Sequence, residues 1–290
     1  MRVMRECLPN AVRAQPKAVQ ATVLAALCIL SFAAPALAGD ERPSWRDIWK
    51  WRETWSGVDI ARDNWLLYSG VTVAPFGHIH EPGWRMRLAG GYGQYKYEGN
   101  RGTGPTPQIQ SFAAATYYGD ALIGYLERWG PLTAKAFAGI SYLTHEIAPL
   151  DPDNLVSGDD IGFKGALELW LNIGDVGFAS FDASWNTAHD TRNVRSRLGA
   201  RFAENWSGGI EGWLNLDNQS DCDLGWDDSA ACYRDDKTEL LDYTRAGLFL
   251  RYDWDGGELS LSGGVSGGSF ASSGEASPEP YATLNWLTQF

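Results

Sequence analysis

The sequence predicts an all-β fold: an antiparallel transmembrane β-barrel of about twelve strands, with ten or fourteen as the alternatives. Three observations predict it. Apolar and polar residues alternate along many segments, short connections alternate with longer ones, and tryptophans stand beside the short connections. Such a barrel has short periplasmic turns and longer outer loops. A soluble antiparallel sandwich is the competing fold, because it is also built from alternating strands.

Residues 1–38 have the features of a secretory signal peptide. Four basic residues, the last of them Lys17, precede an apolar run from Ala18 to Ala34, and a small-x-small site follows at 36–38. We expect cleavage before Gly39. No stretch reaches the roughly 20 apolar residues of a spanning helix, so strands are expected to cross the membrane.

The chain that remains after cleavage is strongly acidic. The full sequence has 24 basic and 36 acidic residues, of which the signal peptide removes four and one, leaving 20 and 35. The net charge is then about −15, with histidine taken as neutral. This balance argues against a nucleic-acid partner, which requires a basic surface.

Residues 39–53 are expected to form a periplasmic leader. Ser44 can cap a short amphipathic helix in which Trp45, Ile48 and Trp49 share one side. A disordered leader is the alternative.

Residues 54–290 are expected to form the barrel itself. The clearest alternation runs over residues 163–173, with Leu167 and Leu169 on one face and Lys164 and Glu168 on the other. Period two places successive side chains on opposite faces of a strand. The final ten residues alternate in the same way. They are long enough to form a tilted strand that crosses a bilayer, which takes about 9–11 residues. We expect this closing strand to pair with a first strand at 54–61.

The connections between the expected strands alternate in length. Short ones occur at 129–131, 174–175, 203–205 and 255–257, and longer ones at 99–108, 144–160, 187–191, 218–240 and 270–279. With twelve strands, both termini fall on the side of the short turns. That parity is expected of a single-chain barrel in the outer membrane of a Gram-negative bacterium.

Aromatic residues gather beside the same short turns. Trp84, Trp129, Trp206 and Trp254, together with the terminal Phe290, would form an aromatic belt at one membrane interface. A soluble sandwich has no reason to collect tryptophan at one end. The belt therefore favours the membrane barrel.

The inward faces of the expected strands carry charges of both signs. The candidate lumenal charges are Arg85, Arg87, Lys135, Lys164, Glu168, Arg195, Arg197, Arg201, Glu211, Arg245 and Arg251. In a narrow barrel such charges are expected to pair and fill the interior. The alternative is a small basic channel for anionic or sugar solutes, in which Trp170, Trp213 and Phe137 stack on sugar rings.

The longest outer loop, 218–240, is acidic and contains Cys222 and Cys232. Two cysteines close in sequence in an exported protein are expected to form one disulfide. The loop lacks the spacing of an EF-hand, so no metal site and no cofactor are assigned. Outer-membrane lipids and lipopolysaccharide are the expected neighbours of these loops.

The sequence pattern does not place any histidine in a catalytic group. His145 is followed by Glu146, and His189 by Asp190, at the outer ends of expected strands. Neighbouring residues of a strand face opposite ways, so neither pair forms a dyad. No catalytic residue is assigned, and the protein is expected to be non-enzymatic. A hydrolase or acyltransferase that modifies outer-membrane lipids is the alternative.

Glycine and aromatic residues recur in a pattern that resembles a known family. The pattern runs through Tyr68-Ser-Gly70-Val71, the segment Gly83 to Tyr97, Gly124-Tyr125 and Phe137-Ala-Gly139-Ile. It resembles the BcsS family of alphaproteobacterial cellulose biosynthesis proteins, which are assigned to the outer membrane. The resemblance implies a role in making or exporting cellulose alongside an inner-membrane synthase, with cellulose or the synthase machinery as partners. A passive channel for small solutes is the alternative function.

Overall fold

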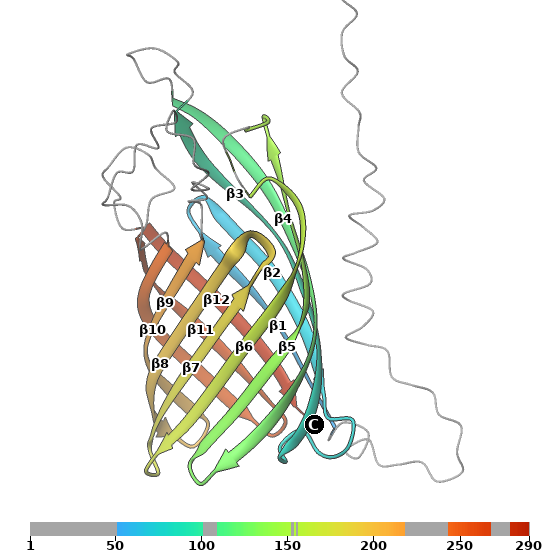
Figure 1. Cartoon of the computed structure of the whole chain (residues 1–290). Helices are drawn as coiled ribbons and strands as arrows, with labels where there is room; N and C mark the ends of the chain where they lie inside the picture. The colour runs from blue at the N-terminus through green and yellow to red at the C-terminus, as the bar shows by residue number, and fades with distance from the viewer. Residues whose placement is uncertain are drawn as a thin grey trace, which may run out of the picture. The chain divides into compact units, whose positions relative to one another are not determined.

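The structure is a closed barrel of twelve antiparallel strands, seen in a computed structural model that describes residues 51–100, 109–151, 154, 156–217, 243–267 and 279–289 (Figure 1). Each strand pairs with its neighbours in sequence, and β12 closes the barrel against β1. This confirms the predicted fold and strand number. The expected signal peptide and nearly all of the expected leader lie outside the described residues.

The strands occupy the following ranges. They are β1 Arg52–Ala61, β2 Asn64–Val73, β3 Gly83–Asn100, β4 Ile109–Trp129, β5 Leu132–Ala148, β6 Gly158–Ile173, β7 Gly177–Asn186, β8 Thr191–Ala203, β9 Trp206–Asp217, β10 Tyr243–Trp254, β11 Gly257–Gly267 and β12 Glu279–Gln289. A single 3₁₀ turn, η1 at Ala188–Asp190, joins β7 to β8. The first strand begins two residues earlier than expected, because Arg52 and Glu53 already pair with β2.

Five connections lie at one end of the barrel, which we call the turn end. Four of them are short, and Gly130 and Gly174 make two of these reversals with φ of 58° and 60°. Residues with a Cβ rarely adopt that conformation, so glycine suits both positions. The fifth connection, residues 74–82, is longer and is held by Arg85, whose guanidinium donates to the carbonyls of His78 and Ile79 at 3.2 and 3.0 Å.

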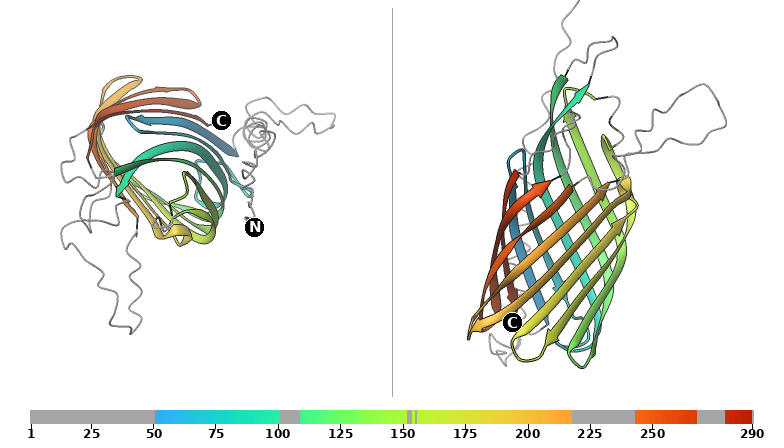
Figure 2. Two further views of the ribbon diagram at one scale, coloured as in Figure 1. Left: turned by 90° about the horizontal axis from the view of Figure 1, so that it is seen from above. Right: turned by 90° about the vertical axis from the view of Figure 1, so that its left-hand side faces the viewer.

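Strands β3, β4 and β5 are longer than most others, at 18, 21 and 17 residues. Figure 2 shows β3 and β4 extending past the rim that the shorter strands form. The sequence pattern predicted a loop at 144–160, which was wrong at both ends: β5 continues to Ala148 and β6 begins at Gly158. The alternation there is weak because polar residues occupy both faces, as with His145 and Glu146 and with Asp159 and Asp160.

The outward surface of the barrel is apolar. Side chains such as Leu248, Ile123 and Leu261 remain 67%, 56% and 53% exposed, and they alternate with buried residues on the same strands. A water-soluble sandwich would cover such a band, whereas a membrane barrel presents it to lipid. Within the described ranges, no helix is both long enough and apolar enough to span a membrane.

Candidate functional site in the barrel lumen

The first charge cluster joins one side of the lumen to the other near the turn end. Lys135 on β5 lies opposite Glu168 on β6 in the strand register, and its Nζ is 3.7 Å from Glu168 Oε2. The same Nζ donates to Glu53 Oε1 on β1 at 3.2 Å. Arg87 on β3 pairs with the other oxygen of Glu168. Two cations and two carboxylates from four strands thus balance one another inside the barrel.

A second cluster centres on two carboxylates, Asp59 and Glu211. Arg245 donates to both oxygens of Asp59, with Nη2 2.6 Å from Oδ1, and Thr283 Oγ1 donates to Oδ2 at 2.8 Å. Glu211 has no exposed side-chain surface. Its carboxylate accepts hydrogen bonds from three side chains: Arg195 at 2.7 Å, Arg197 at 2.9 Å and Tyr281 at 2.9 Å. A buried carboxylate needs such donors, because burial without them is costly.

A third cluster lies between β4, β5, β6 and β7. Lys164 Nζ is 2.6 Å from Asp120 Oδ2, and Ser141 Oγ donates to Asp120 Oδ1 at 2.6 Å. Asn186 Nδ2 donates in turn to Ser141 at 3.0 Å. Both oxygens of Asp120 are therefore engaged by partners on neighbouring strands.

The structure places the eleven predicted lumenal charges as follows. Nine form ion pairs: Arg87, Lys135, Lys164, Glu168, Arg195, Arg197, Glu211, Arg245 and Arg251. Arg201 instead donates to Asn172 Oδ1 at 2.7 Å. Arg85 instead holds the 74–82 connection by donating to backbone carbonyls. Pattern reasoning missed the acidic partners Glu53, Asp59 and Asp120, for which the signal is a carboxylate among mostly uncharged strand residues.

The three aromatic residues expected to stack on sugar contact guanidinium groups instead. Arg87 lies 3.8 Å from the ring centre of Phe137, and Arg195 lies 4.4 Å from that of Trp213. Trp170 has Arg251 at 4.9 Å and stacks on Phe178. These rings support the charge clusters by cation–π contact, and their stacking on sugar stays a prediction.

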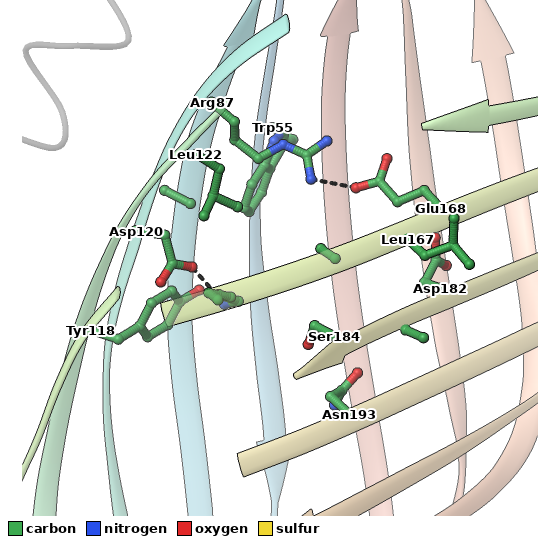
Figure 3. A pocket seen from close by; sticks show the side chains of 14 residues that line it. Trp55, Arg87, Tyr118, Asp120, Leu122, Leu167, Glu168, Asp182, Ser184 and Asn193 are labelled. Carbon is green, nitrogen blue, oxygen red and sulfur yellow. Dashed lines mark hydrogen bonds and ion pairs between the residues drawn. The ribbon is translucent and has the colours of Figure 1, made fainter. Parts of the chain in front are cut away.

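A cavity of about 170 Å³ remains between the first and third clusters. Figure 3 shows Tyr118, Asp120 and Arg87 on one side of it and Glu168, Asp182 and Ser184 on the other. Its lining is mixed, with Trp55, Arg87, Ala89, Tyr118, Asp120, Leu122, Lys164, Ala166, Leu167, Glu168, Asp182, Ala183, Ser184 and Asn193. Sequence reasoning did not identify this space, because its residues come from six strands, β1, β3, β4, β6, β7 and β8, that only the closed barrel brings together.

The four belt tryptophans all lie at the turn end. Trp84 and Trp206 begin β3 and β9, and Trp129 and Trp254 end β4 and β10. Trp84 packs edge-on against Tyr125 at 5.5 Å, and Trp206 packs on Tyr252 at 4.9 Å. Phe290 lies outside the described residues, as do Cys222 and Cys232, so the belt's last member and the disulfide stay predictions.

The structure brings His145 and His189 together at the outer ends of β5 and η1. Their ring centres are 5.4 Å apart, and the Tyr95 hydroxyl is 3.0 Å from His145 Nδ1. Thr144, by contrast, donates to Asp159 at 2.6 Å. Among the described residues, no group of three or more His, Cys, Asp or Glu side chains is placed to hold a metal ion.

Comparison with known proteins gives one family and several structural likenesses. A model of the family "Cellulose biosynthesis protein BcsS" matches residues 54–223. No curated protein matches the chain. Among solved structures, the KdgM porin is 8% identical with a TM-score of 0.43, covering 82% of this chain and 99% of the porin.

Two further barrels are similar at the same level. The transport unit of the autotransporter AIDA-I from Escherichia coli is 13% identical over 93% of this chain and 97% of its own, with a TM-score of 0.43. The outer membrane protein Omp33 of Acinetobacter baumannii is 11% identical over 83% of this chain and 99% of its own, with a TM-score of 0.37.

Proposed function

Since this chain belongs to the BcsS family of cellulose biosynthesis proteins, we propose that it is a non-enzymatic outer-membrane barrel that assists the production or export of cellulose. Its site of action is the outer membrane of a Gram-negative bacterium, reached after removal of the signal peptide. The apolar outward face and the ion-paired interior support this placement, because they invert the arrangement of a soluble protein.

One observation carries the accessory role: ion pairs join strands that are far apart around the barrel. Lys135 and Glu53 connect β5 to β1, and Arg245 and Asp59 connect β10 to β1. Each pair spans the interior and occupies space that a solute or a polymer would need. This filling favours a barrel that anchors or assists export machinery over a passive small-solute channel.

The surroundings of the histidines favour a non-enzymatic role. His145 Nδ1 faces the hydroxyl of Tyr95, and its ring packs against His189. The aliphatic hydroxyl beside it, that of Thr144, is engaged by Asp159. A lipid hydrolase or acyltransferase would need a histidine directed at such a hydroxyl and oriented by a carboxylate.

The partners that fit this role are the lipids and lipopolysaccharide around the barrel and the cellulose synthase machinery or cellulose itself. The barrel reaches lipid through its apolar band. The periplasmic end, which carries the tryptophan belt and the 74–82 connection, is the side available to a complex that crosses the periplasm.

The proposal is tested by deleting the gene and measuring cellulose by dye binding and by acid hydrolysis of the extracellular polymer. We expect a clear loss of extracellular cellulose, restored by the wild-type gene supplied in trans. Deleting the gene of an unrelated outer-membrane barrel serves as the control for general envelope damage. Unchanged cellulose output in the deletion strain would rule out the accessory role.

A further inference from the structure

We propose that the lumenal cavity is a binding site for one uncharged sugar unit, such as the end of a short β-glucan. The inference rests on the proposed function for its choice of sugar. The cavity has a volume of about 170 Å³, which equals roughly six water molecules at about 30 Å³ each. A space of that size suits a single pyranose ring and excludes a folded polymer.

The charges around the cavity select against anionic ligands. Arg87 is neutralised by Glu168, and Lys164 is neutralised by Asp120 at 2.6 Å. Asp182 adds a third carboxylate to the same lining. Both cations of the lining are therefore already paired with carboxylates, which disfavours binding of a phosphate or a uronic acid at this cavity.

Two aromatic side chains are available to the ligand. Trp55 on β1 and Tyr118 on β4 both line the open space. Lys164 lies 5.6 Å from the Tyr118 ring centre, farther than Arg87 and Arg195 lie from the rings of Phe137 and Trp213. The carbon-bound hydrogens on the face of a sugar ring are apolar and pack on such rings, as in pockets that combine aromatic walls with a few polar groups.

Polar groups that can meet sugar hydroxyls lie on the opposite wall. Asp182 and Ser184 alternate along β7, and Asn193 on β8 is the register partner of Ser184. In the part of the chain that the structure describes, no hydrogen bond or ion pair involves the Asp182 carboxylate. Asp182 can accept from hydroxyls and Ser184 can donate or accept, so this wall offers hydrogen bonds opposite the two aromatic rings (Figure 3).

The experiment measures binding by the whole barrel, purified in detergent, with isothermal titration calorimetry. The probes are cellotetraose, an oligogalacturonate of the same length and Mg²⁺ alone. We expect binding of cellotetraose and none of the galacturonate. Asp182→Ala is expected to weaken cellotetraose binding about 10-fold, since it removes a hydrogen-bonding group from the cavity wall.

Matched variants separate binding from folding. Trp55→Ala should lower affinity by at least 10-fold and Trp55→Phe by much less, while Trp65→Ala, which changes an aromatic residue packed against Tyr92, should leave it unchanged. Heat-modifiable gel migration shows which variants are folded. If Trp55→Ala does not fold, Asp182→Asn and Ser184→Ala carry the test.

Three results would overturn the inference: no binding of cellotetraose to the wild-type barrel, binding that survives in both Asp182→Ala and the Trp55 variant, or tighter binding of galacturonate or of Mg²⁺. Measuring cellulose output in the gene deletion strain keeps the two proposals apart. Loss of cellulose on deletion combined with absent sugar binding would leave the accessory role standing and remove only the sugar site.

Discussion

Arg245 on β10 forms a two-pronged ion pair with Asp59 on β1, with Nη2 2.6 Å from Oδ1. The two residues are 186 positions apart in the chain, and their strands are separated by β11 and β12. Both side chains are at least nine-tenths buried. The pair therefore links β1 to β10 across the interior, in addition to the strand pairing that connects them around the barrel.

Breaking this pair should destabilise the barrel strongly. Asp59→Asn removes the carboxylate that the buried Arg245 guanidinium pairs with on β1, and removing one partner of a buried pair costs about 3–5 kcal/mol. We expect the variant to unfold at a lower temperature or urea concentration, read from heat-modifiable migration in gels.

The Arg62–Glu279 pair provides the matched control, because it joins the β1–β2 turn to β12 at the surface, with side chains 67% and 32% exposed. Glu279→Gln should cost no more than about 1 kcal/mol. The double variant Asp59→Leu/Arg245→Met should be more stable than Asp59→Asn alone. Equal unfolding of Asp59→Asn and Glu279→Gln would show that the interior pair has no special role.

The fold class, the strand number and the inward charges could be predicted from the sequence because they depend on local alternation and on connection length. The pairing of those charges could not. Whether Lys135 meets Glu53 depends on the shear of the closed barrel, which a period of two does not determine. Glu53 also precedes the expected first strand, so its place in the lumen appeared only with the structure.

Two other features escaped sequence reasoning for related reasons. The contact between His145 and His189 joins the end of β5 to the η1 turn, and no motif links them in sequence. The cavity between Trp55 and Asp182 is formed by strands on different sides of the barrel. Such sites depend on tertiary closure, whereas the tryptophans at the turn end were visible because each stands next to a short connection.

An arginine placed on the outward face should destabilise the barrel by an amount that depends on its depth in the membrane. Leu248 is 67% exposed in the middle of β10, and Phe202 is 65% exposed beside the turn that follows β8. Leu248→Arg should destabilise the barrel in lipid vesicles by about 2–4 kcal/mol, and Phe202→Arg by about 0–1 kcal/mol. Unfolding in urea from vesicles provides the measurement. If both variants are as stable as the wild type, this face does not contact lipid.

The 74–82 connection should loosen when Arg85 loses its charge. Its guanidinium donates to several backbone carbonyls of that segment, and Phe76 within the segment is 87% exposed. Arg85→Met is expected to speed chymotrypsin cleavage after Phe76 several-fold, whereas Arg128→Met, a change at an exposed arginine, should not. Cleavage of Arg85→Met at the wild-type rate would mean that the carbonyl contacts do not hold the segment.

Planar-bilayer conductance measures directly whether paired charges fill the lumen. The wild-type barrel should insert without producing stable conductance steps, because ion pairs occupy its interior. In one of them, Lys135 Nζ on β5 lies 3.2 Å from Glu53 Oε1 on β1. The Glu53→Ala/Lys135→Ala variant, which removes that pair, should give measurable steps. Stable, open conductance of the wild-type protein, unchanged in the variant, would contradict the account and favour a passive channel.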